Sequence, residues 1–163
     1  MHYFAYGSNL SIARLQQRAP SAQRVGLFML HSHDLRFHKP GRDGSGKCDA
    51  FETGDASHCV MGSVFKIDPA EKARLDRAEG LGFGYGEKEV TVVDESGLKI
   101  TAHTYYATKI DGSLRPYSWY LNHVIVGAIE SSIPEVYLGR IRSIVSTEDP
   151  DPERDARERA IYS

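Results

Sequence analysis

Six short stretches of the chain combine apolar positions with β-branched and aromatic residues, which predicts β-strands there. In the last two stretches apolar and polar residues alternate on either side of a turn at 94–97, so they are predicted to form a hairpin with one buried face. A glycine-rich segment between the third and fourth stretches is predicted to be a loop. The predicted strands are 3–6, 25–30, 34–38, 59–67, 87–93 and 98–107.

Apolar residues spaced three or four apart predict four helices, and capping residues mark their ends. The first helix runs from about 11 to 18 and stops before Pro20. In the second, Asp68 is the capping residue and Pro69 takes the first helical position. Gly80 closes that helix, so Glu79 lies at its C-terminal end. The third helix spans 116–130, and the fourth starts at 134.

The order of these elements favours an α+β fold over a doubly wound sheet, because no β-α unit repeats along the chain. With 163 residues, of which 40% are hydrophobic and 26% charged, the chain is expected to form one domain with a proper core. We place this domain at 1–147. The charged, proline-containing segment 148–163 is predicted to be a peripheral tail.

Net charge and cysteine content narrow the class of protein. A net charge of −2 gives no basic surface for nucleic acid, and the longest apolar run is too short to cross a membrane. A strand predicted so close to the N-terminus leaves no room for a signal peptide, so we expect a cytoplasmic protein. Cys48 and Cys59 lack the spacing of a metal site and are predicted to be free thiols.

The first predicted strand ends in Gly7-Ser8-Asn9, immediately before a helical pattern, so the chain turns sharply into a helix start. Glycine lets a ligand approach the backbone, and the first N–H groups of a helix have no partner within it. The helix dipole adds partial positive charge there, so the turn suits a carboxylate or a developing oxyanion. A capped turn without any ligand explains the same local features.

Two motifs resemble those of the γ-glutamylcyclotransferase-like family, which releases 5-oxoproline from γ-glutamyl compounds. The first is the sequence YGSN at residues 6–9, one strand in from the N-terminus, which is similar to the family's signature loop. The second is LDRAEG at residues 75–80, followed by Phe83 and Tyr85, which is similar to the family's helix-ending acidic motif. The similarity continues through 89–92, 104–105 and 116–144 and so covers nearly the whole chain.

The resemblance implies a small, mostly antiparallel β-barrel with flanking helices and a ligand cavity at one end. It also implies γ-glutamylcyclotransferase activity without a metal or cofactor, with Glu79 as the catalytic residue. The YGSN form is typical of family members that act on amino-acid-type substrates rather than on γ-glutamylamines. The residues implied in substrate binding are Tyr6, Gly7, Ser8, Asn9, Tyr85 and Tyr105, with Tyr120 a weaker candidate.

Such a substrate needs few catalytic groups from the protein. A γ-glutamyl amide carries its own nucleophile, because the α-amine can reach the γ-carbonyl and close a ring. We expect Glu79 to carry the proton from this amine to the leaving nitrogen, in surroundings that include Phe83 and Tyr85. Backbone N–H groups of residues 7–9 would hold either the oxyanion or the α-carboxylate. Ser8 is not expected to be a covalent nucleophile, since no Ser-His-acid arrangement accompanies it.

Three further motifs resemble ligand-binding sequences. Residues 41–48 nearly match a phosphate-binding loop, but Cys48 replaces its hydroxyl residue and no helix start follows, so a nucleotide site is not expected. The family resemblance implies that this loop lies beside the active site and helps to shape substrate specificity. The glycines of 80–86 follow a helix rather than a strand, which indicates either a mobile loop that closes over a ligand or a passive surface loop. His31 and His33 form an incomplete set of metal ligands.

Two other functions stay open on the sequence. One is removal of a γ-glutamyl protecting group in a biosynthetic pathway, and the other is a non-catalytic module that binds 5-oxoproline or a γ-glutamyl ligand. A small-molecule γ-glutamyl compound is the expected partner in each case. The apolar helices near 116 and 134 fit a homodimer surface and core packing equally well.

Overall fold

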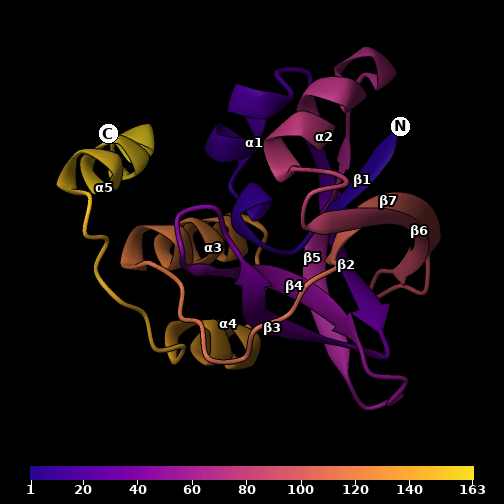
Figure 1. Cartoon of the computed structure of the whole chain (residues 1–163). Coiled ribbons are helices and arrows are strands. Elements are labelled where there is room, and N and C mark those ends of the chain that lie inside the picture. Colours follow the sequence, from indigo (N-terminus) through magenta and orange to yellow (C-terminus); the bar gives the residue numbers. More distant parts are fainter.

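Five strands close into a barrel in the computed structural model, which describes residues 1–163 (Figure 1). Neighbouring strands are antiparallel except β1 and β7, whose parallel contact between Tyr3 and His103 closes the barrel. The predicted α+β class and the mostly antiparallel barrel are therefore confirmed. In order around the barrel, the strands are β1 (His2–Ala5), β5 (Cys59–Lys66), β2 (Gln23–His31), β6 (Tyr85–Val93) and β7 (Lys99–Ala107).

A second sheet consists of β3 (His33–Pro40) paired with β4 (Gly46–Glu52). The prediction of a loop throughout this glycine-rich segment was wrong, because β4 occupies its second half. Charged residues break the apolar pattern of β4, and Asp49 among them is buried. Its carboxylate accepts the backbone N–H of Ala107 at 2.8 Å and lies 2.7 Å from His38 Nε2. These partners come from β7 and β3, so the neighbouring sequence gives no sign of them.

Local capping residues fix the helix ends as predicted. The Ser11 hydroxyl caps α1, and the Asp68 carboxylate accepts the N–H of Ala70 at 2.9 Å in the turn that leads into α2. Gly80 ends α2 in the left-handed conformation, with φ of 72°. None of the helices has both the length and the apolar composition that a membrane span requires. The first four helices are α1 (Ile12–Arg18), α2 (Lys72–Glu79), α3 (Ser118–Glu130) and α4 (Glu135–Arg142).

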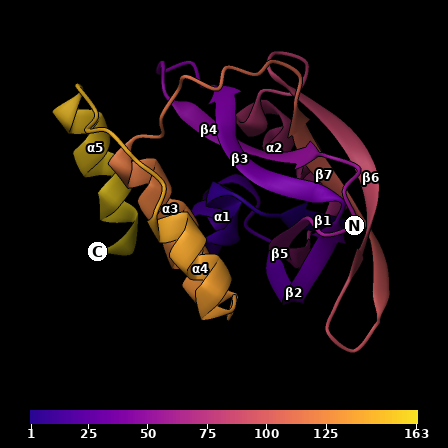
Figure 2. The same ribbon diagram turned by 90° about the horizontal axis from the view of Figure 1, so that it is seen from below.

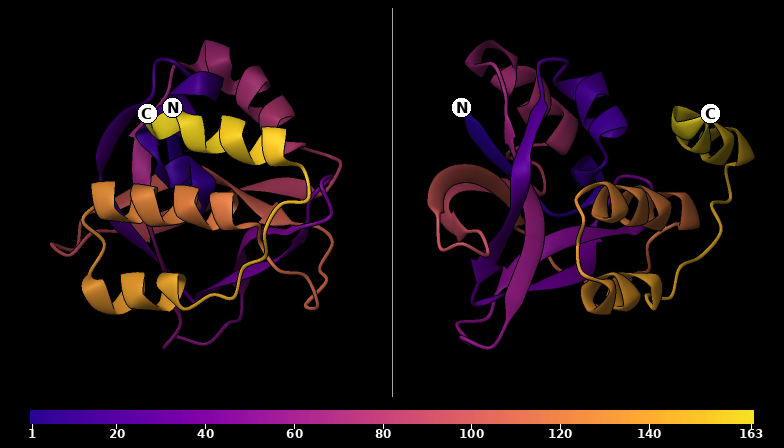
Figure 3. Two further views of the ribbon diagram at one scale, coloured as in Figure 1. Left: turned by 90° about the vertical axis from the view of Figure 1, so that its left-hand side faces the viewer. Right: turned by 180° about the vertical axis from the view of Figure 1, so that it is seen from behind.

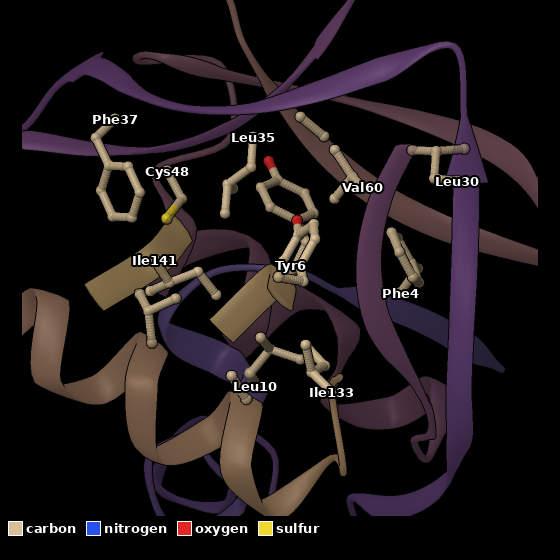
Figure 4. Packing of buried hydrophobic residues seen from close by; sticks show 14 of the residues in the cluster. Phe4, Tyr6, Leu10, Leu30, Leu35, Phe37, Cys48, Val60, Ile133 and Ile141 are labelled. Carbon is tan, nitrogen blue, oxygen red and sulfur yellow. The ribbon is translucent and has the colours of Figure 1, made fainter. Parts of the chain in front are cut away.

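The alternation of side chains along β1 divides the core into two clusters. Tyr3 and Ala5 belong to a smaller cluster with residues of α1 and α2, which lie together at one end of the barrel (Figure 1). Phe4 belongs to a larger cluster that includes apolar residues of β3, β4, α3 and α4. Phe37 of β3 and Ile141 of α4 both lie in this larger cluster (Figure 4). The apolar faces of α3 and α4 are therefore used in core packing.

The segment 148–163, predicted as a peripheral charged tail, ends in helix α5 (Pro152–Arg159). Helix α5 lies beside α3, which in turn lies beside α4, on one flank of the molecule (Figures 2 and 3). The helix buries none of its own residues, yet Glu158 forms an ion pair with Arg14 at 2.6 Å and lies 2.9 Å from His123 of α3. Ionic contacts rather than apolar burial therefore hold α5 on the domain.

Candidate active site

A narrow cavity lies where the chain leaves β1, between the two core clusters. It brings together all eight residues that the sequence analysis names as catalytic or substrate-binding candidates, Tyr120 included, although they come from the loop after β1, α2, β6, β7 and α3. Five of its lining side chains are tyrosines. The complete lining is Tyr3, Tyr6, Gly7, Ser8, Asn9, Cys48, Glu79, Tyr85, Tyr105 and Tyr120.

Glu79, the last residue of α2, is fixed by two side chains from the N-terminal part of the chain. Its Oε1 atom accepts hydrogen bonds from Asn9 Nδ2 at 2.8 Å and from Arg18 Nη1 at 2.6 Å. The same Arg18 nitrogen donates to Asn9 Oδ1 at 2.8 Å, so the three side chains form a closed triangle. The guanidinium stabilises the ionised carboxylate, which is the form that can accept a proton. The second oxygen, Oε2, has no protein partner and is available to a ligand.

The loop after β1 offers unpaired donors beside this carboxylate. Ser8 starts a short 3₁₀ helix, Ser8–Leu10, whose first hydrogen bonds are donated by Leu10 to Gly7 and by Ser11 to Ser8. The N–H groups of Ser8 and Asn9 therefore have no partner in the turn. Only glycine fits at position 7 without a steric clash, since a Cβ atom there would lie 2.8 Å from Cys48 Cβ. Two backbone N–H groups of this loop are thus free to donate to a ligand.

The tyrosine hydroxyls hold the walls of the cavity together. Tyr85 donates to the Cys48 carbonyl at 2.5 Å, and Tyr6 donates to the Tyr105 carbonyl at 2.6 Å. Tyr105 donates to Asp76 Oδ1 at 2.5 Å. Burial raises the pKa of each of these phenols, so they stay protonated. Because their protons are already engaged, these groups shape the cavity and do not transfer protons.

Cys48 lies in the wall opposite the loop. Its backbone N–H donates to the Tyr120 hydroxyl at 3.0 Å, which joins β4 to α3 across the cavity. Burial raises the pKa of the Cys48 thiol to about 12, so the group is an inert neutral thiol. Cys48 and Cys59 are both free, as predicted.

A wider cleft continues from the cavity. Ser8, Glu79, Tyr85 and Tyr120 line both spaces. The cavity has a volume of about 20 Å³ and the cleft about 350 Å³, so a ligand larger than a water molecule that reaches the cavity must also occupy the cleft. Glu79 stands at their boundary. A substrate can therefore present its reacting bond to Glu79 and extend its remaining part into the cleft.

Several features of the site differ from the sequence-based expectation. Phe83 was expected near Glu79 as apolar surroundings, but its side chain is 82% exposed. Tyr85 is buried at the first residue of β6, where neighbouring Gly84 has a positive φ of 151°. Arg18 was not selected at all. The Arg18 side chain meets Glu79 only through the packing of α1 against α2, and no local motif marks that contact.

Comparisons with known proteins agree with this geometry. The sequence profile of the AIG2-like family matches residues 59–141. Over 149 residues the chain is 35% identical to the γ-glutamylcyclotransferase of Bos taurus and 32% identical to that of Homo sapiens. Each of these alignments covers 87% of this chain and 77% of the relative. A solved structure described as a γ-glutamyl cyclotransferase superposes with a TM-score of 0.87 at 26% identity, over 98% of both chains.

Proposed function

The chain belongs to the AIG2-like family of γ-glutamylcyclotransferases, and we propose that it cyclises a γ-glutamyl amide to 5-oxoproline with release of an amino acid or amine. One observation carries the proposal for this chain. The Glu79 carboxylate is held by Arg18 and Asn9 at the boundary of cavity and cleft, with one oxygen free for a substrate.

The reaction is an intramolecular aminolysis, in which the substrate's own α-amine displaces the leaving amine. The α-amino nitrogen forms a bond to the γ-carbonyl carbon, and the bond from that carbon to the leaving nitrogen breaks. The attacking nitrogen starts as an ammonium and ends as the lactam N–H, so two of its protons pass to the leaving nitrogen, which departs as an ammonium. Neither water nor another reactant is consumed. Holding the amine against the carbonyl removes most of the entropic cost of the step.

Glu79 is proposed to carry the proton. Its ionised form, favoured by Arg18, accepts a proton from the α-ammonium and makes the amine nucleophilic. After attack, the protonated carboxyl group delivers this proton to the departing nitrogen. The carboxylate, ionised again, takes the second proton from the attacking nitrogen and passes it to the released amine. The Oε2 atom performs these transfers, because Oε1 is engaged by Asn9 and Arg18.

The loop after β1 is proposed to hold an anionic group of the substrate. The N–H groups of Ser8 and Asn9 have no partner within the 3₁₀ turn and can donate to an anion. These donors suit either the oxyanion of the tetrahedral intermediate or the α-carboxylate. A substrate whose α-carboxylate is replaced by a carboxamide separates the two roles: loss of affinity assigns the loop to the carboxylate, and unchanged affinity assigns it to the oxyanion.

We also place the reaction in the cytoplasm. The two free thiols, Cys48 and Cys59, fit a reducing compartment. Glutathione is a γ-glutamyl compound of that compartment, so it belongs among the substrates tested.

The test is release of 5-oxoproline by the wild-type protein. The purified chain is incubated with γ-glutamyl dipeptides, glutathione and γ-glutamylamines, and 5-oxoproline is measured by mass spectrometry against protein-free incubations. We expect release from γ-glutamyl amino acids well above the spontaneous rate. Binding of 5-oxoproline by calorimetry without turnover of any substrate would instead identify a binding module.

A further inference from the structure

The cleft beside the cavity carries an excess of positive charge. Seven arginine and lysine residues line it, together with one carboxylate, that of Glu79. Three of the seven are paired within the protein: Arg14 with Glu158, Arg18 with Glu79, and Lys47 with Asp43. The other four form no ion pair. These four, which we call the cationic cluster, are Lys39, Arg42, Arg77 and Lys109.

Lys39 is the unusual member of the cationic cluster because it is buried. Only 8% of this residue is exposed, and its ammonium donates no hydrogen bond to a protein acceptor. The Nζ atom lies 4.5 Å from the centre of the Tyr85 ring. Its pKa is lowered by burial. The Lys39 ammonium lines the cleft and has no carboxylate within ion-pair distance, so it is placed to meet an anion supplied by a ligand.

The backbone around Lys39 leaves space for this placement. A Cβ atom at Gly84 would lie 2.9 Å from Lys39 Cε and 3.0 Å from Nζ. Gly84 also has a positive φ of 151°, which glycine adopts without strain. The glycine at this position therefore allows the lysine stem to pass under the loop and place its ammonium in the cleft.

The position of the cationic cluster relative to Glu79 defines which part of a substrate it meets. If the proposed function holds, the reacting amide lies at Glu79, because this residue protonates the leaving nitrogen. The glutamyl part then faces the cavity and the Ser8 donors, and the leaving group extends into the cleft. With the substrate placed in this way, the cationic cluster faces the leaving group.

We propose, resting on the proposed function, that the preferred leaving group carries at least two anionic groups, as an acidic amino acid or an acidic peptide does. An ordinary amino acid supplies one carboxylate, which is enough for one member of the cationic cluster. A buried, unpaired Lys39 together with three exposed cations suits a second anionic group. Carboxylate and phosphate oxygens share this chemistry, and the test includes both.

The first experiment compares kcat/KM for matched γ-glutamyl dipeptides by release of 5-oxoproline. γ-Glutamyl-glutamate and γ-glutamyl-glutamine differ in one charge at nearly equal size, and γ-glutamyl-lysine reverses that charge. γ-Glutamyl-phosphoserine tests a phosphate group in place of the second carboxylate. We expect the acidic dipeptides to exceed the glutamine dipeptide by roughly tenfold, mainly through KM, and the lysine dipeptide to be the poorest. Added salt should reduce the preference.

The variants separate a binding role from a structural one. Lys39→Met keeps most of the side-chain volume and removes the charge. The ratio of kcat/KM for the glutamate dipeptide to kcat/KM for the glutamine dipeptide should therefore fall towards one. The double variant Arg42→Gln with Lys109→Gln changes only exposed side chains and should lower the same ratio without loss of folding. Lys66→Met, an exposed lysine at the end of β5, is the control and should retain the wild-type ratio.

Failure of this inference and failure of the proposed function give different results. Release of 5-oxoproline with equal kcat/KM for the glutamate and glutamine dipeptides would overturn the inference and leave the function standing. If no dipeptide is turned over, the function fails, and calorimetry then decides the inference. Tighter binding of γ-glutamyl-glutamate than of γ-glutamyl-glutamine, lost in Lys39→Met, supports an anionic ligand, and equal binding overturns it.

Discussion

At the residue scale, the central feature is the triangle formed by Asn9, Arg18 and Glu79. The Asn9 amide nitrogen donates to Glu79 and to the Tyr3 hydroxyl, and its oxygen accepts from Arg18, so the side chain has no donor left for a substrate. Asn9 and Arg18 therefore act through Glu79 as positioning residues, whereas the Asn9 backbone N–H belongs to the substrate cradle. Their side chains fix which oxygen of Glu79 faces the substrate.

Replacing Arg18 tests this positioning role. Arg18→Met removes the ion pair at 2.6 Å and should lower kcat by about tenfold, because the ionised carboxylate loses its stabilising charge. Arg18→Lys, which keeps the charge, should recover part of the activity. A kcat of Arg18→Met equal to that of the wild type would contradict the role, and steady-state release of 5-oxoproline by the three proteins measures it.

Replacing Gly7 tests the close contact between the loop and β4. In Gly7→Ala the new methyl group would lie 2.8 Å from Cys48 Cβ, so the loop has to move. We expect a loss of about 1–3 kcal/mol in the free energy of unfolding, together with reduced turnover. Gly112→Ala is the matched control, because its Cβ meets no atom within 4 Å. Urea unfolding of both variants distinguishes a local clash from a general effect of alanine.

At the element scale, the two parts of the site that local sequence describes were predicted well. The turn after β1 and the end of α2 are marked by glycine and by capping residues, and such signals act over a few residues. Strand β4 was missed because its buried Asp49 is satisfied by His38 and Ala107 from other strands. The contact of Arg18 with Glu79 was missed for the same reason, since it depends on how α1 packs on α2.

Helix α5 gives a prediction at this scale, because ionisable groups hold it. Neighbouring His123 and Arg14 lower the pKa of Glu158 to about 2 against the cost of its burial, so its contribution is complete near neutral pH and is lost as pH falls from about 4.5 towards 2. Burial lowers the pKa of His123, so protonation of that ring also opposes the fold below about 6.5. Acidification should therefore release α5 before the barrel unfolds.

Hydrogen exchange of the α5 amides between pH 7 and about pH 2 measures this release. Glu158→Gln should loosen α5 already at pH 7 and flatten its pH dependence. Glu153→Gln, an exposed carboxylate on the same helix that accepts no side-chain hydrogen bond, should behave like the wild type. If α5 and the barrel strands lose protection together at every pH, the helix is part of the same cooperative unit and the prediction is wrong.

At the scale of the whole molecule, the barrel places the site at the junction of two core clusters. The cavity takes Tyr3, Tyr85 and Tyr105 from the smaller cluster and Tyr6, Cys48 and Tyr120 from the larger one. Periodicity identified the strands but not the closure of the barrel, which depends on the parallel contact of β1 with β7, about a hundred positions away. The family resemblance supplied that closure, and the structure confirms it.

Opposite charges are distributed unevenly around this junction. The chain as a whole has a net charge of −2, yet the cleft collects seven cations and a single carboxylate. Overall composition therefore gave no indication of an anionic ligand, since residues from α1, β3, α2 and the segment after β7 meet only in the folded barrel. A local field of this kind attracts anionic substrates even when the net charge is slightly negative.

The most direct test of the account is the rate of 5-oxoproline release by Glu79→Gln, measured by mass spectrometry on a γ-glutamyl dipeptide that the wild type turns over. Glutamine can still accept the hydrogen bonds of Asn9 and Arg18, so the fold and substrate affinity should persist while kcat falls by about 10²–10⁴-fold. Glu89→Gln, which changes an exposed carboxylate on β6, should retain the wild-type rate. A Glu79→Gln protein that keeps near-normal turnover would contradict the assignment of Glu79 as the proton carrier.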